Sequence, residues 1–289
     1  MVEKHLLVTV SEQEKMLYGV HFVANFFGWE IKPRITLFYT APRPPALWDE
    51  ERTVESEARS EEYGKQMKAK GRKALASAKR QLLRFGFEES LVETKLQTRK
   101  FSKAVDILQE GAKGHYDAVI LGRRGLSRFE EAFDESVSRA VLDKSGDLPL
   151  WICRRPETGR KNVLVCVDGS ESANRAADHA GFILGGESPH SVTLFMAGSD
   201  KNETETVFSK CRELLAANGV PPEKVETRTI DSGGVAKSIL KEAGEGRFAA
   251  VAVGRSGGAD KGIFGKMFTG SVSTPLFKAL EGAALWICR

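Results

Sequence analysis

The chain has 289 residues, with 43 lysines and arginines against 39 aspartates and glutamates, so its formal net charge is +4. A charge this small does not by itself favour nucleic acid as a partner. No apolar run approaches the roughly 20 residues of a membrane-spanning helix, and residues 1–5 lead directly into a short apolar strand instead of a signal peptide. We therefore expect a cytoplasmic protein that binds neither membranes nor nucleic acid.

Metal and redox chemistry have little support in the sequence. The four cysteines form no Cys-x-x-Cys pair, and the five histidines are scattered along the chain. Three of the cysteines lie inside strand-like apolar runs, where a reduced thiol behaves as a small hydrophobic group. We assign no metal site.

In chain order, the first half begins with a short apolar strand at 7–10, an amphipathic helix, and a second strand at 35–38. The apolar side chains of the helix recur at helical spacing, so this helix is predicted to pack on a sheet. These side chains are Met16, Leu17, Val20, Val23, Ala24 and Phe27.

An insertion at about 41–85 follows, with a proline-containing loop and a long charged helix. Acidic residues dominate 49–62 and basic residues dominate 65–84, an order that suits the helix dipole. We favour a solvated helix face over a site for a polyanion. The buried side of this helix is predicted from the helical spacing of Tyr63, Met67, Ala74, Ala78 and Leu82.

The second half alternates short strands with amphipathic stretches, a pattern that favours a parallel sheet with crossover helices. After its first strand, residues 168–172 supply a turn and a helix N-cap. The helix that follows has an apolar face made by Ala176, Ala177, Ala180, Ile183 and Leu184. The predicted strands are Asn162–Val167, Ser191–Met196, Lys224–Thr229, Phe248–Val253 and Ala284–Cys288.

The two halves repeat one another. Leu-Trp-Ile-Cys-Arg occurs at 150–154 and again at 285–289, and the glycine-containing block at 118–125 matches the one at 250–257. Because the order of matching segments is kept, the repeated unit is a whole domain. We expect two domains, 1–156 and 157–289, with five strands each.

A glycine-rich loop lies in the repeated block. Gly254–Gly257 follows a buried strand, and Gly270–Ser273 opens the next helix, whose first turn tolerates Pro275. Glycines let the backbone approach an oxyanion closely, and free N–H groups at a helix start favour negative charge. The loop therefore suits phosphate, although glycine pairs at a strand end are equally compatible with tight turns.

This succession, together with Val165–Ser170 after the first strand, resembles the universal stress protein family over nearly the whole chain, once in each half. The resemblance implies two tandem Rossmann-like domains of the adenine nucleotide alpha hydrolase type, each a five-stranded parallel sheet with helices on both faces. It also implies binding of ATP, with or without Mg²⁺, through the pattern G-x(2)-G-x(9)-G-[S/T].

For the second half, the resemblance implies that Asp168 lies near adenine and ribose and that the backbone at Ala197 meets the adenine. Twelve residues, and not nine, separate the second and third glycines of the pattern here. The loop supplies the remaining nucleotide-binding positions, which are Gly254, Arg255, Gly257, Gly270, Ser271, Val272 and Ser273.

The first half departs from the pattern at two positions. Ser11 stands where the acidic residue is expected, and Glu135 replaces the third glycine. A carboxylate in the phosphate pocket would repel the ligand by about a few kcal/mol. We expect a degenerate first site formed by Ser11, Gly122, Gly125, Glu135 and Ser136.

The function expected from the sequence is an ATP-binding or adenine-nucleotide-binding module for stress response or regulation. One alternative is a scaffold that binds no nucleotide and uses the insertion to hold an unknown protein partner. The other is a slow ATPase, although no Walker lysine or paired acid and base stands beside the loop, so an enzyme is not expected. The resemblance further implies an intrachain pseudo-dimer, in which Pro149–Cys153 pairs with Ala284–Cys288.

Overall fold

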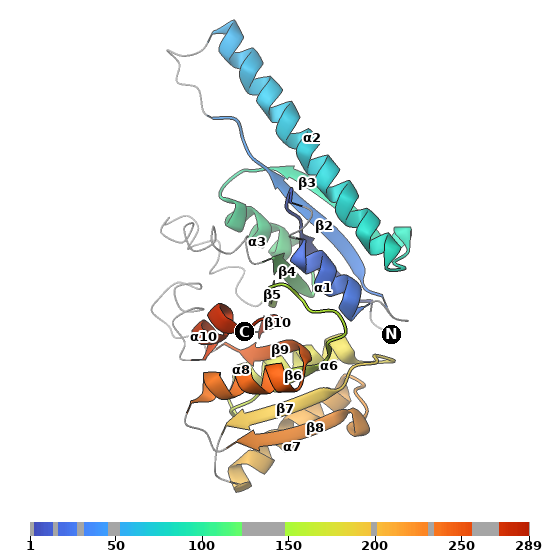
Figure 1. Ribbon diagram of the computed structural model, residues 1–289, viewed down its shortest axis with the longest axis vertical. Coiled ribbons are helices and arrows are strands. Elements are labelled where there is room, and N and C mark those ends of the chain that lie inside the picture. The colour runs from blue at the N-terminus through green and yellow to red at the C-terminus, as the bar shows by residue number, and fades with distance from the viewer. Residues whose placement is uncertain are drawn as a thin grey trace.

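The computed structural model describes residues 3–13, 17–27, 32–45, 53–122, 148–197, 201–230, 234–255 and 272–288. Within these residues, ten strands form one sheet in the order β3-β2-β1-β4-β5-β10-β9-β6-β7-β8 (Figure 1). The strands are β1 (His5–Thr9), β2 (Arg34–Ala41), β3 (Val92–Thr98), β4 (Ala118–Gly122), β5 (Leu150–Cys153), β6 (Lys161–Cys166), β7 (Val192–Ala197), β8 (Val225–Ile230), β9 (Phe248–Gly254) and β10 (Ala284–Cys288).

Each half contributes five parallel strands, as predicted. The first strand of each half, β1 or β6, has the second strand on one side and the fourth on the other. The two halves meet at the pair β5 and β10, which run antiparallel with Trp151 directly opposite Trp286. The expected intrachain pairing is confirmed, and it makes the sheet continuous across the molecule.

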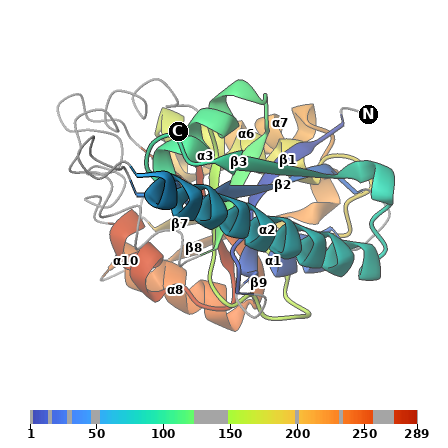
Figure 2. The ribbon, with the colours of Figure 1, turned by 90° about the horizontal axis from the view of Figure 1, so that it is seen from above.

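Helices cover both faces of the sheet (Figures 1 and 2). The first, second, sixth and seventh helices pack on one face, and the third, eighth and tenth pack on the other, as the two buried apolar clusters show. These helices are α1 (Tyr18–Phe26), α2 (Val54–Arg84), α6 (Glu171–Leu184) and α7 (Lys201–Ala217) on the first face, and α3 (Lys103–Lys113), α8 (Val235–Glu245) and α10 (Ser273–Ala279) on the second.

The strand and helix predictions agree closely with the structure. The five predicted strands of the second half begin and end within one residue of the observed ones. The five apolar residues predicted for α6 are buried, and so are those predicted for the α1 segment, apart from Met16, which lies outside the described residues.

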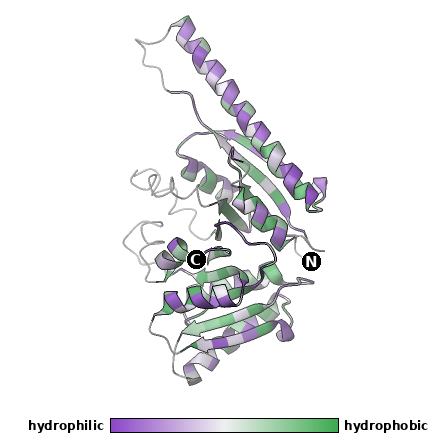
Figure 3. Ribbon diagram, in the orientation of Figure 1, coloured by the Kyte–Doolittle hydropathy of each residue, from purple (hydrophilic) through white to green (hydrophobic). Residues whose placement is uncertain are grey.

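The long helix α2 departs from the prediction at its N-terminal end. Thr53 and Ser56 cap it reciprocally, each side chain bonding the other residue's backbone N–H. The buried stripe begins at Met67, whereas Tyr63 is 37% exposed. The prediction of a buried Tyr63 was wrong because α2 extends beyond the ends of β2 and β3, so none of the described strands lies beneath its first turns (Figure 1). Figure 3 shows hydrophilic residues along much of this helix.

The described residues contain no helix that combines the length and the apolar composition needed to cross a bilayer. They also contain no cluster of three or more histidine, cysteine or acidic side chains arranged to hold a metal ion.

Candidate functional site

The candidate site of the second half lies at the carboxyl ends of three adjacent strands. Cys166 in β6 is level with Phe195 in β7 and with Val253 in β9. The residues that follow these positions therefore reach the same edge of the sheet. From β6 the chain continues to β7 on one side, and it later returns to β9 on the other side. This reversal makes the edge a topological switch point, where open parallel sheets bind ligands.

Asp168 is fixed in this edge by a local turn. One of its carboxylate oxygens accepts a hydrogen bond from the backbone N–H of Ser170 at 3.0 Å, and Gly169 between them has φ +77°. The Ser170 hydroxyl in turn accepts from the N–H of Ala173 at 3.2 Å and caps α6. The carboxylate of Asp168 is thus oriented by the backbone while the residue stays exposed to solvent.

Gly254 ends β9 against the first turn of α6. A Cβ atom at this position would lie 2.2–2.4 Å from backbone atoms of Ser172 and Ala173, so no larger residue fits without a backbone shift. The next residue, Arg255, is nearly buried, and its N–H donates to the carbonyl of Cys288 at 2.8 Å. This amide therefore anchors the start of the loop to β10, a role that the sequence did not indicate.

Ala197 is the last residue of β7 and is half-buried. Val272 and Ser273 are also half-buried, Ser273 begins α10, and no side-chain hydrogen bond caps this helix. Pro275 lies in the first turn of α10, as predicted. Several predicted site residues lie outside the described part of the chain, namely Gly125, Glu135 and Ser136 in the first half and Gly257, Gly270 and Ser271 in the second.

The first half carries an acidic side chain at this edge that was not predicted from the sequence. Ser11 follows β1 and Gly122 ends β4, in the places that Asp168 and Gly254 occupy in the second half. Beside Ser11, the carboxylate of Glu12 accepts a hydrogen bond from the hydroxyl of Tyr39 at 2.6 Å. Burial and this contact raise the pKa of Tyr39. A carboxylate one residue after the expected position was the signal available in the sequence.

The same edge of the first half holds two buried polar atoms without hydrogen-bond partners among the described residues, the Thr40 hydroxyl oxygen and Arg99 Nε. In the repeat, Thr40 stands where the second half has Ala197. The two edges therefore differ in polarity as well as in the position of their acidic residue.

The thiols near Asp168 are not activated. Burial first, and the negative charge of Asp168 second, raise the pKa of Cys166, and they raise that of Cys211 to about 11. Both side chains therefore stay protonated at neutral pH, and neither is a nucleophile there.

Comparison with known proteins gives two matches to the Universal stress protein family, at residues 3–154 and 159–281. No curated protein sequence matches the chain. Similar solved structures include a universal stress protein in complex with cAMP (21% identity, 45% of this chain and 96% of that chain, TM-score 0.37). A second is the universal stress protein UspA from Lactobacillus plantarum (17% identity, 46% of this chain and 100% of that chain, TM-score 0.33). A third is the cytoplasmic domain of a prokaryotic cation chloride cotransporter (12% identity, 99% of this chain and 95% of that chain, TM-score 0.49). Because these TM-scores lie below 0.5, family placement rests on the two sequence matches.

Proposed function

This chain belongs to the universal stress protein family, and from that premise we propose that its second domain binds an adenine nucleotide, with ATP as the expected ligand. The observation that supports this most directly is the convergence of Asp168, Ala197 and Gly254 at the carboxyl ends of three adjacent strands. The protein would then act as a nucleotide-binding stress-response or regulatory module.

The chemistry of these residues suits a nucleoside. Asp168 presents an exposed carboxylate that can accept hydrogen bonds from ribose hydroxyls, and its orientation is set before the ligand arrives. Ala197 has a small side chain at the end of β7, so a base can reach the backbone there. Mg²⁺, where present, would neutralise phosphate charge.

We further propose that the first domain does not bind ATP. The Glu12 carboxylate is engaged by Tyr39, and Glu135 in the sequence of the loop would repel phosphate. The first domain would instead stabilise the second through the continuous sheet at β5 and β10.

Native mass spectrometry and calorimetric titration with ATP test this proposal. We expect one ATP per chain. Asp168→Asn keeps an oxygen for the Ser170 turn but removes the charge, so it should weaken binding at least about fivefold with an unchanged melting temperature. Gly270→Glu copies Glu135 into the second loop and should abolish binding.

Two outcomes contradict the proposal in different ways. Two bound ATP molecules per chain would show that the first domain is active, and no binding at all would favour the scaffold alternative. We propose binding without efficient catalysis, so phosphate release should be no faster with the unaltered chain than with Asp168→Asn. Faster release would favour the slow ATPase.

A further inference from the structure

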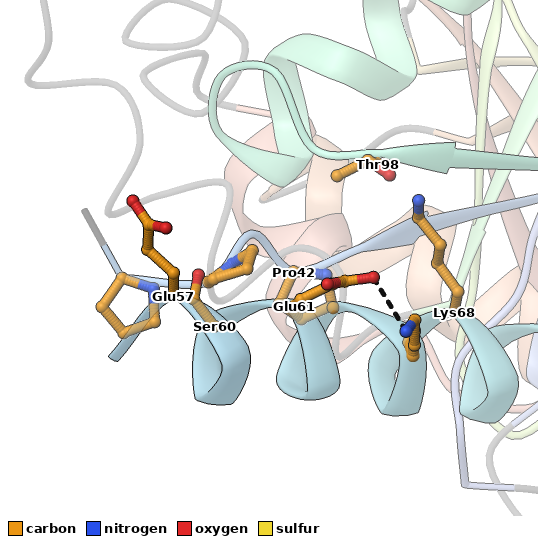
Figure 4. Close-up of a pocket in the computed structure, with 10 residues that line it drawn as sticks. Pro42, Glu57, Ser60, Glu61, Lys68 and Thr98 are labelled. Atoms are coloured by element: carbon orange, nitrogen blue, oxygen red, sulfur yellow. Dashed lines mark ion pairs between the residues drawn. The ribbon is translucent and has the colours of Figure 1, made fainter. Parts of the chain in front are cut away.

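The insertion of the first half builds a cavity of about 570 Å³ beyond the ends of β2 and β3, a size typical of ligand sites. Pro42, directly after β2, and Thr98, the last residue of β3, lie on one side of it, and α2 forms the other side (Figure 4). Ligands of open parallel sheets bind outside the carboxyl ends of strands. The cavity therefore lies at the carboxyl edge of the sheet, beyond its outer strands β3 and β2, in the half whose nucleotide site is predicted to be degenerate.

The face of α2 that lines the cavity continues the stripe that packs on the sheet. Toward the C-terminus this face is apolar and buried, from Met67 to Leu82. Toward the N-terminus the same side of the helix carries Glu57, Ser60 and Gly64. The change from apolar to polar residues coincides with the end of the sheet, so none of the described strands lies beneath this part of the stripe.

The charges in the cavity are separated along the helix. Glu61 and Lys65 neutralise each other in an ion pair of 2.8 Å. The side chains of Glu57 and Lys68 flank this pair and make no ion pair or hydrogen bond with any described residue, and Figure 4 shows Lys68 extending toward Thr98. Lys68 follows Glu57 by eleven positions in the helix, so their Cα atoms lie about 16 Å apart along its axis. The cavity thus has a negative side chain toward the start of α2 and a positive one toward the sheet.

The wall opposite α2 accepts hydrogen bonds but donates few. Pro42, Pro44 and Pro45 have no N–H, and no backbone hydrogen bond joins residues 42–45 to the rest of the described chain. Each ring fixes the φ angle of its residue, which lowers the entropy cost of ordering this segment around a ligand. A ligand that suits this wall has an apolar surface and regularly spaced N–H donors.

We propose that this cavity binds a short extended peptide, with its carboxylate beside Lys68 and Thr98 and its amino end toward Glu57. About five extended residues span 16 Å, which matches the rise of α2 from Glu57 to Lys68. The N–H groups of the peptide meet the proline carbonyls, and the side chains of Glu57 and Lys68 set its direction.

Calorimetric titration with penta-alanine tests the proposal through three forms of one probe: free termini, an amidated C-terminus and an acetylated N-terminus. The free form should bind. Amidation and Lys68→Ala should each weaken binding about tenfold, and together no more than either alone, because both remove the same contact. Acetylation of the peptide and Glu57→Gln should likewise each weaken binding about tenfold, and together no more than either alone, because both remove the contact between Glu57 and the amino end.

Lys73→Ala is the matched control, because Lys73 is an exposed lysine of the same helix that does not line the cavity. It should leave the affinity unchanged. Equal affinity for the free and amidated peptides, or a difference between them that survives Lys68→Ala, would overturn the proposal. So would the absence of binding at millimolar peptide. Inorganic phosphate that binds through Lys68 where the peptide does not would identify a small-anion site instead.

Discussion

At the scale of single residues, Gly254 has two explanations that the sequence alone does not separate. A glycine after a buried strand suits close approach of a phosphate, but the structure also requires glycine there, because β9 ends against the backbone of Ser172 and Ala173 in α6. The glycine is therefore needed to bring the strand end and the helix start together. The same contact places Asp168, two residues before the cap of α6, beside the end of β9.

We expect Gly254→Ala to destabilise the protein by about 1–3 kcal/mol, because the new methyl group overlaps backbone atoms that cannot move independently of α6. The shift of the urea unfolding midpoint measures this loss. Gly244→Ala, in α8, is the matched control, because a Cβ there has nothing within 4 Å. It should be neutral or stabilising by up to about 1 kcal/mol. Equal destabilisation by both changes would show that Gly254 is not packed as described.

At the scale of elements, α2 shows what a helical pattern can and cannot predict. The spacing of Met67, Ala74, Ala78 and Leu82 correctly identified the buried side of the helix. The same spacing also placed Tyr63 on the buried side. Helical periodicity shows which side of a helix is apolar, but it does not show how far the sheet beneath the helix extends. Where β2 and β3 end depends on pairing between segments far apart in the sequence.

The two glycines of α2 test where its buried face ends. A Cβ on Gly71 would lie 2.5 Å from the Tyr39 ring and 2.8 Å from Leu96, whereas a Cβ on Gly64 would make an ordinary 3.7 Å contact with Pro44. We expect Gly71→Ala to destabilise by about 1–3 kcal/mol, and Gly64→Ala to stabilise by up to about 1 kcal/mol through helix propensity. Thermal unfolding of the two variants provides the measurement. Stabilisation by both would mean that α2 does not pack on β2 as described.

The repeat and the alternation of strands and helices sufficed to predict five parallel strands in each half, and the family resemblance implied the pairing of β5 with β10 that joins them into one sheet. The parts that could not be predicted depend on contacts between distant residues. Glu12 adjoins a strand end in the sequence, but its bond to Tyr39 depends on where β2 places that ring. The bond from the Arg255 amide to Cys288 likewise requires β9 and β10 to be neighbours.

At the scale of the whole molecule, the two domains are joined by aromatic rings at the junction of β5 and β10. Trp151 and Trp286 stack with ring centroids 4.1 Å apart, and both are fully buried. The indole N–H of Trp151 donates to Nε2 of His179 at 3.0 Å, whereas that of Trp286 has no partner among the described residues. In the repeat, the first half has Phe22 where the second half has His179. Phe22 has no ring nitrogen that could accept a hydrogen bond from the Trp286 N–H.

Burial lowers the pKa of His179 to about 4, against an ordinary value of 6.5. Between pH 6.5 and pH 4 the imidazole therefore stays neutral in the folded protein, whereas the same side chain binds a proton in the unfolded chain. The contribution of His179 to the free energy of unfolding is fully present above pH 6.5. It is lost as the pH falls toward 4, which lowers the free energy of unfolding by about 3 kcal/mol. His190, whose pKa is also lowered chiefly by burial, adds to the same trend. Urea unfolding midpoints measured from pH 7 to pH 4 should fall steadily.

His179→Phe separates the histidine from other acid effects, because it copies the side chain that the first half already uses. At pH 7 it should cost about 1–3 kcal/mol, since the Trp151 N–H loses its acceptor. Between pH 7 and 4 the variant should lose less stability than the unaltered protein, so the two curves converge. Curves that stay parallel would exclude His179 as a source of the acid sensitivity. Phe22→His is the reciprocal change: if the junction is as symmetric as the repeat implies, it gives Trp286 an acceptor and makes the fall with acid steeper.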